Sequence, residues 1–214
     1  MELIVANLSG PVREATLCGR PGLVAPATLL VPGVLNGSKG PLYYSGELNT
    51  RRYMDWNGMP LVVRHPKDVD DEDVMVSAMS PEAWDRYWTG QLFGSEVDEA
   101  GVLKGEAWFD REATERHDEA LSDEYKMVPR LLAGESIELS TGLHTVDVPA
   151  PEGAVYNDTP YKHVVTDYKP DHLAILPDEV GACSVKKGCG VNVVNEWSDE
   201  ARKAAAEAEL ARLT

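Results

Sequence analysis

Apolar and polar positions alternate with a period of two through residues 136–141. One face of this segment carries Ile137, Leu139 and Thr141, and the other face carries Ser136, Glu138 and Ser140. Alternation of this kind between two glycines is typical of a half-buried strand. The pattern therefore predicts a strand that turns Ser140 away from the core, beside Gly142.

Shorter patterns elsewhere predict many strands and few helices. Turn residues divide positions 1–36 into short strands, and further strand-like runs lie at 61–63, 91–97, 102–109, 161–168 and 173–176. Ser80 followed by Pro81 indicates a helix start, residues 112–132 have a helical period interrupted by Pro129, and residues 198–213 form an alanine-rich helical pattern. The sum predicts a β-rich α+β fold.

The net charge of −16 narrows the choice of partners. An acidic chain repels the phosphate backbone, so we expect no nucleic-acid partner. No apolar run approaches the roughly 20 residues of a membrane span, and the N-terminus lacks the features of a signal peptide, so we expect no membrane partner either. The acidic residues at positions 68–73 indicate a solvated loop, because the glycine and distal glutamate of a calcium loop are missing.

The three cysteines predict thiols, with no disulfide framework and no metal site. Three are too few for such a framework, which favours a reducing compartment, and Cys183 and Cys189 are spaced too widely for a zinc knuckle. No H-E-x-x-H motif accompanies the histidines. We therefore expect neither a metal nor a cofactor.

Two of the five histidines stand where a side chain can project into a cleft. His65 precedes Pro66 at the end of the strand-like run 61–63, and His172 follows Pro170 at the start of another. A serine hydroxyl becomes a nucleophile when a neutral imidazole takes its proton, so either histidine is a candidate base for Ser140. An ordinary polar strand serine is the alternative interpretation, because no generic nucleophile motif surrounds it.

Taken together, residues 60–66, 135–142 and 171–175 resemble the prohead (capsid maturation) proteases of tailed phages and the related herpesvirus assemblins. Their order matches the family order of histidine, serine and histidine, and the resemblance covers roughly residues 1–195. It implies a β-barrel core flanked by helices. It also implies a protease domain over 1–195, followed at 196–214 by a C-terminal helix that either docks on the domain or begins a scaffold-like extension.

The resemblance also implies a role for each site residue. Ser140 is the nucleophile, His65 the base and His172 the third member, with Glu138 and, less favourably, Asp171 as rival third members. A neutral third histidine stabilises the imidazolium less than a carboxylate does, so turnover should be slow. Activity should fall below about pH 6.5, the ordinary histidine pKa.

Backbone N–H groups of Thr141 and Gly142 are the candidate oxyanion donors. Assemblins carry an arginine in the loop after the second histidine, and here no arginine stands soon after His172, only Lys186 and Lys187.

By the same resemblance the chain is a serine endopeptidase of phage assembly. Its expected substrates are the scaffold protein, the N-terminal extension of the major capsid protein and the protease itself. Its expected location is the interior of the prohead, assembled in the host cytoplasm, where the enzyme could form a homo-oligomer. A non-catalytic structural or scaffolding module with the same fold is the alternative.

Overall fold

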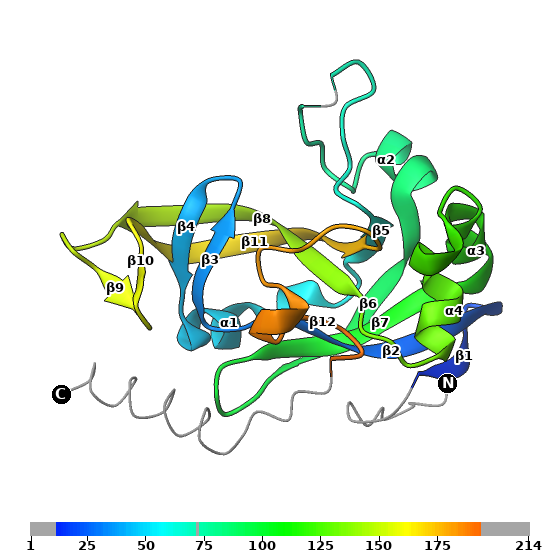
Figure 1. Cartoon of the computed structure of the whole chain (residues 1–214), viewed down its shortest axis with the longest axis horizontal. Helices are drawn as coiled ribbons and strands as arrows, with labels where there is room; N and C mark the ends of the chain where they lie inside the picture. The colour runs from blue at the N-terminus through cyan, green and yellow to red at the C-terminus, as the bar shows by residue number, and fades with distance from the viewer. Residues whose placement is uncertain (1–11, 72, 194–214) are drawn as a thin grey trace.

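The computed structural model describes residues 12–71 and 73–193, which form a strand-rich α+β fold around one large mixed sheet (Figure 1). The strands are β1 (Arg13–Leu17), β2 (Arg20–Leu30), β3 (Gly33–Gly37), β4 (Gly40–Tyr44), β5 (Pro60–Val63), β6 (Trp88–Val97), β7 (Leu103–Asp110), β8 (Glu138–Pro149), β9 (Val155–Tyr156), β10 (Thr159–Pro160), β11 (His163–Leu176) and β12 (Gly190–Val191). The helices are α1 (Gly46–Arg52), α2 (Pro81–Tyr87), α3 (Arg111–Asp118) and α4 (Met127–Leu132), with short 3-10 turns η1 (Tyr53–Trp56), η2 (Asp123–Tyr125) and η3 (Val185–Lys187).

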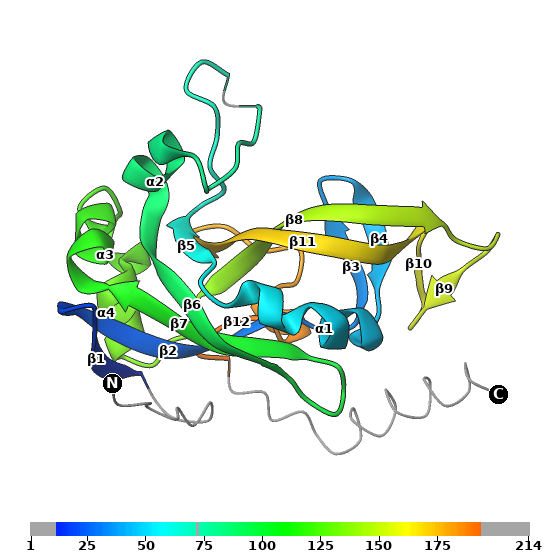
Figure 2. The ribbon, with the colours of Figure 1, turned by 180° about the vertical axis from the view of Figure 1, so that it is seen from behind.

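The long strand β11 organises the sheet. The strand order is β1-β2-β7-β6-β5-β11-β4-β3, with β8 paired to β11 and β12 paired to β2. One edge of β11 pairs in parallel with β4 near its start and with β5 near its end, while its other edge pairs with antiparallel β8 along the whole length. Helix α1 connects β4 to β5 and lies beside the middle of β11, where Arg52 binds Asp167 (Figure 2).

The sheet is open, so the structure does not show the closed barrel that the resemblance implied. The nearest approach to closure is at β12. Its residues pair with β2, and Val191 makes a single bridge to Ile137, just before β8. One bridge is not a ladder, and the two ends of the sheet remain separate there.

Several predicted elements are confirmed. The alternating segment 136–141 lies mostly in β8, with Leu139 fully buried and Ser140 half-buried. The runs 91–97 and 102–109 form β6 and β7, joined by a turn in which the Asp98 carboxylate accepts the Ala100 and Val102 N–H groups. Ser80 caps α2 by accepting the Ala83 N–H, as expected for a serine before proline.

The helical segment predicted over 112–132 with an interruption at Pro129 is indeed interrupted, but the break lies before Pro129, which is inside α4. It is divided into α3, the short turn η2 and α4. The break is stabilised by Asp118, whose carboxylate accepts the backbone N–H groups of Met127 and Val128 at 2.7 and 2.9 Å. A buried carboxylate that caps a second helix is more favourable here than one continuous helix.

The predictions for the chain ends and for membrane association fare differently. The predicted helix at 198–213 and the junction at 195–197 lie outside the described residues, as do positions 1–11. Within the described ranges, no helix combines the length and the apolar character that crossing a membrane requires. Of the acidic segment, residues 68–71 and 73 lie in a largely exposed loop between β5 and α2, and Figure 1 shows this loop standing out from the rest of the structure.

Candidate functional site

A bulge in β11 places two adjacent polar side chains on the same side of the strand. Pro170 pairs with Leu143 and His172 pairs with Gly142, so Asp171 is an extra residue without its own partner on β8. Adjacent residues of a regular strand point to opposite faces, and a bulge removes that restriction. As a result, His172 Nδ1 lies 2.7 Å from Asp171 Oδ1.

The second histidine of the site, His65, lies just after the end of β5. Val63 pairs with Ile175 of β11, and the Arg64 N–H donates to the Ile175 carbonyl at 2.9 Å. Arg64 then adopts a left-handed conformation (φ 63°), which ends the strand and redirects the chain. His65 Nδ1 consequently lies 2.8 Å from His172 Nε2.

The carboxylate of Asp171 has further donors beyond the histidine. Its Oδ1 accepts the Ala78 backbone N–H at 2.9 Å, and its Oδ2 accepts the Ser77 hydroxyl. Asp171 and His172 are both buried, with 8% and 5% of their surfaces exposed. We call Asp171, His172 and His65 the Asp–His–His array. The loop 66–76 begins beside His65 and ends beside Ser77, so both of its ends are joined to this array.

The array fixes the tautomers of both histidines. A carboxylate only accepts hydrogen bonds, so His172 Nδ1 carries the proton and donates it to Asp171. In a neutral His172 ring, Nε2 is then the acceptor for the His65 Nδ1 proton. His65 Nε2 is thereby left with a free lone pair, which is the form that a general base requires.

Burial and hydrogen bonding set the charge states of the array. Burial lowers the pKa of His65 to about 4, and the neighbouring His172 adds to the effect, so His65 is neutral at pH 7. Burial alone would raise the pKa of Asp171. Hydrogen bonds from His172, Ser77 and the Ala78 N–H outweigh it and hold that pKa well below its usual range. Asp171 is therefore ionised at neutral pH.

Gly142 supplies the space that the His172 ring occupies. A Cβ atom at position 142 would lie 2.2 Å from His172 Cε1 and 2.5 Å from both ring nitrogens. These distances are far below van der Waals contact, so any side chain at this position would displace the imidazole. The glycine after Ser140 thus has a role in the site that the sequence pattern did not indicate.

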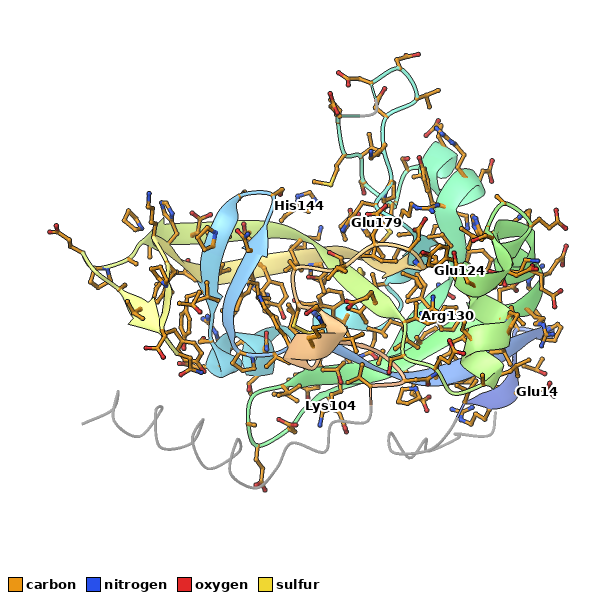
Figure 3. All side chains as sticks on the ribbon, viewed as in Figure 1. Glu14, Lys104, Glu124, Arg130, His144 and Glu179 are labelled. Carbon is orange, nitrogen blue, oxygen red and sulfur yellow. A yellow bond between two sulfur atoms is a disulfide. The ribbon has the colours of Figure 1, made fainter. Side chains whose placement is uncertain are left out.

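Ser140, His65 and His172 line one cavity of 480 Å³. The walls are formed by β8, by the β3–β4 hairpin, by residues 75–77 and by residues 182–183. In Figure 3, His144 marks the part of β8 that lies beside the tip of this hairpin, where Lys39 Nζ donates to Thr145 Oγ1 at 3.0 Å. The two histidines are hydrogen-bonded to each other, whereas Ser140 Oγ has no hydrogen bond to any residue that the structure describes.

Glu138, the rival third member, is engaged elsewhere. Its Oε2 accepts the Val185 N–H at 3.0 Å and the Gly181 N–H at 3.4 Å. These donors belong to the segment after β11, which passes close to β8, since a Cβ on Gly181 would lie 2.0 Å from the Leu139 carbonyl oxygen. His172 is therefore the residue that contacts His65, whereas Glu138 is hydrogen-bonded to the segment after β11.

The two N–H groups that we expected as oxyanion donors point to opposite edges of β8. Thr141 and Gly142 are consecutive residues of β8, opposite Leu173 and His172 of β11. Successive N–H groups of an extended strand point to opposite edges, so at most one of these two can face away from β11. Of the two lysines after His172, Lys187 is directed to the Ala182 carbonyl at 3.3 Å.

The prediction of two free thiols at Cys183 and Cys189 is wrong. These residues form a disulfide, with Cα atoms 5.4 Å apart. The turn η3 and Gly188, in a left-handed conformation (φ 94°), fold the chain back so that residues six apart meet. We call residues 181–190 the cystine loop. Cys18 is a free, exposed cysteine.

Among residues 12–71 and 73–193, no cluster of three or more histidine, cysteine or acidic side chains has the arrangement of a metal site. Comparison of the chain with protein-family models, with curated proteins and with solved structures found no match. The assignment of a function therefore rests on the geometry of the site and on the resemblance of the three sequence segments.

Sequence reasoning missed Ser77 and the position of Asp171 behind His172. Neither has a local signal, because Ser77 reaches Asp171 across 94 residues of sequence and the bulge depends on pairing with β8. The adjacent pair Asp171-His172 after Pro170 was the available clue, since proline weakens regular pairing of a strand.

Proposed function

We propose that this chain is a serine endopeptidase of the Ser-His-His type that acts in phage prohead maturation. The observation that carries the proposal is the Asp–His–His array, which lines the same cavity as Ser140 and leaves His65 Nε2 with a free lone pair. A neutral, oriented imidazole that lines the same cavity as a half-buried serine is the arrangement that acyl transfer needs.

In the proposed mechanism, Ser140 Oγ attacks the scissile carbonyl carbon as its proton passes to His65 Nε2. The resulting imidazolium keeps its Nδ1 hydrogen bond to His172, and His172 keeps its own to the ionised Asp171. His65 then gives the proton to the leaving amine, and water hydrolyses the acyl-enzyme by the reverse sequence of proton transfers. The hydrogen bond between Ser140 and His65 has to form as substrate binds, because catalytic hydrogen bonds often tighten only in the complex.

The resemblance to prohead proteases supplies the biological part of the proposal. It supports an assemblin-like barrel, in which the open sheet would close next to the Ile137–Val191 bridge, and cleavage of the scaffold protein, the capsid-protein extension and the protease itself inside the prohead. It also supports a protease domain over 1–195, with 196–214 as a docked helix or the start of a scaffold-like extension.

One observation favours a second candidate, a structural module of the prohead that has the protease fold without the chemistry. Ser140 Oγ lacks a hydrogen bond to His65 in this structure. In such a module the array would serve only to connect β5, β11 and the loop 66–76.

The test is incubation of the purified chain with the scaffold and capsid proteins of the same phage. We expect cleavage by the wild type and by Ser122→Ala, an exposed serine remote from the cavity, and none by Ser140→Ala. Equal cleavage by the Ser140→Ala variant would refute the nucleophile. Absence of cleavage by every variant, with correct assembly of the particle, would favour the structural module.

A further inference from the structure

The cavity beside Ser140 has an apolar wall that the catalytic mechanism does not use. β2, β3, β4 and β8 contribute the side chains of Leu29, Leu35, Leu42, Tyr44 and Leu139 to it. Leu35 and Leu42 are a direct cross-strand pair of the β3–β4 hairpin. The wall is therefore built on paired strands, which makes it a preformed surface.

Three of these wall residues keep a small accessible surface that the cavity can offer to a ligand. Leu35 and Tyr44 each have 7% of their surface exposed and Leu42 has 5%, whereas Leu29 and Leu139 have none and are fully packed. Close packing is the rule in protein interiors, and a cavity lined by leucines costs stability because its walls lose contacts. The cavity of 480 Å³ is in the size range of ligand pockets.

The charged groups around the cavity are already paired. Lys39 Nζ lies 3.6 Å from Asp147 Oδ1 and donates to Thr145, and the Asp171 carboxylate is bound by the array and by Ser77. A charged side chain that entered the apolar part would lose its hydration without gaining a counter-ion. An aliphatic side chain would bury apolar surface against the leucines.

The free edge of β8 connects the apolar wall to the nucleophile. Apart from the single bridge at Ile137, β11 is the only strand paired with β8 in the part of the chain that the structure describes. Consecutive residues 139–145 line the cavity, so it includes both the core-facing Leu139 and Ser140 on the opposite face. A group bound covalently to Ser140 Oγ therefore lies in the same cavity as the apolar wall.

We infer that this apolar part is a specificity pocket, which takes an aliphatic side chain of about leucine size next to the scissile bond and rejects charged ones. The inference rests on the proposed function for its substrate, a peptide, and adds the class of side chain that the site selects.

The first experiment uses fluorophosphonates with methyl, butyl and hexyl chains. Ser140 Oγ forms a bond to phosphorus, fluoride leaves, and His65 takes the serine proton. We expect the labelling rate at Ser140 to rise about tenfold from methyl to butyl, because additional CH₂ groups are buried.

Two variants test whether the wall causes this dependence. Leu35→Phe should remove most of the rise, because the larger ring fills the pocket. The matched control Leu132→Phe, at a half-exposed leucine outside the cavity, should retain the full rise and keep the rate with the methyl reagent within about threefold of the wild type. Labelling at Ser140 with equal rates for all three chain lengths would overturn the pocket and leave the nucleophile intact.

A second measurement tests whether the pocket binds an aliphatic group in a variant that lacks the nucleophile. The Ser140→Ala chain with ¹³C-labelled leucine methyl groups is titrated with hexanamide and followed by NMR. We expect the Leu35 and Leu42 methyl signals to shift, and the Leu132 signal to stay. Unshifted Leu35 and Leu42 signals would refute the pocket, whereas shifted signals without any labelling of the wild type would refute the nucleophile alone.

Discussion

Two carboxylates, Glu138 and Asp171, lie on the paired strands β8 and β11 that carry Ser140 and His172, and their hydrogen-bond partners differ. Glu138 begins β8 and accepts two backbone N–H groups of the cystine loop. Asp171 lies in the bulge of β11 and accepts the His172 imidazole, the Ser77 hydroxyl and the Ala78 N–H. One acid holds a loop and the other holds the His172 imidazole, although the sequence makes both candidates for the same role.

The difference shows that proximity to Ser140 does not decide which acid acts on the histidine. Glu138 belongs to a regular part of β8, where Glu138 pairs with Leu176 and Ser140 with Ala174. Asp171 is displaced from regular pairing, and only this displacement brings its carboxylate to His172 Nδ1. The role of each acid is therefore set by local strand geometry.

The largest effect that separates the two acids is expected on kcat. Asp171→Asn should lower kcat by about 10²-fold or more, because the amide no longer requires His172 to donate from Nδ1, and His65 then loses its fixed tautomer. Glu138→Gln should change kcat by less than about threefold, since the amide oxygen still accepts the loop N–H groups. Steady-state kinetics on a peptide from the scaffold protein measure both variants. A larger loss of kcat in Glu138→Gln would transfer the role to Glu138.

Gly142→Ala should disturb the Asp–His–His array directly. The new Cβ would overlap the His172 ring, so we expect at least about tenfold loss of activity and a free energy of unfolding lowered by about 1–3 kcal/mol. Gly37→Ala is the matched control, because a Cβ atom at position 37 would have no atom within 4 Å and its effect should stay within about 0.5 kcal/mol. Chemical denaturation and kinetics report the two effects separately. Normal activity of Gly142→Ala would show that the ring position is not required.

The pH dependence should differ from that of an ordinary histidine. Because the pKa of His65 is lowered to about 4, the neutral base persists well below pH 6.5, and the acid limb of kcat/KM should lie near pH 4. This revises the limit of about 6.5 expected from sequence. The groups that face His65 are His172 and, behind it, Asp171. An acid limb near 6.5 in a chain that remains folded would contradict the buried environment of His65.

The same pKa affects stability. Between about pH 6.5 and pH 4 the unfolded state binds a proton at His65 and the folded state does not, so stability falls as the pH falls through this window. The loss is about 3 kcal/mol when complete. His65→Gln should lack this part of the pH dependence, and denaturation curves at pH 7 and pH 4 give the comparison.

The smallest effect is expected in the cystine loop. Replacing Cys183 and Cys189 by serine should lower the free energy of unfolding by about 2 kcal/mol, the entropy of closing so short a loop, and should alter kcat by less than about threefold. Cys18→Ser, at an exposed free cysteine, should leave stability unchanged. A large loss of kcat in the double variant would mean that the start of β8, where Glu138 is bound to the cystine loop, takes part in the chemistry.

The sequence was sufficient for those parts of the fold that depend on local pattern. Alternation predicted β8, the two runs around Asp98 predicted the β6–β7 hairpin, and Ser80-Pro81 predicted the start of α2. Local pattern was not sufficient where a distant group decides the structure. Asp118 divides the predicted helix by capping α4, and the Cys183–Cys189 pair depends on a turn at Gly188.

The candidate site shows the same division. His65, Ser140 and His172 were named from short segments, and the structure places all three around one cavity. The position of Asp171 behind His172 could not be predicted, since adjacent strand residues normally face opposite ways and the bulge arises from pairing with β8. The space at Gly142 is likewise visible only once His172 is placed across from it.

The central claim is that the Asp–His–His array activates Ser140, and labelling by diisopropyl fluorophosphate tests it most directly. Mass spectrometry of the wild type should find one adduct, on Ser140, formed at a rate that falls by about 10³-fold or more in His65→Gln. His163→Gln, which lies outside the cavity, should label at the wild-type rate. An adduct on another residue, or equal rates in the wild type and His65→Gln, would contradict the account.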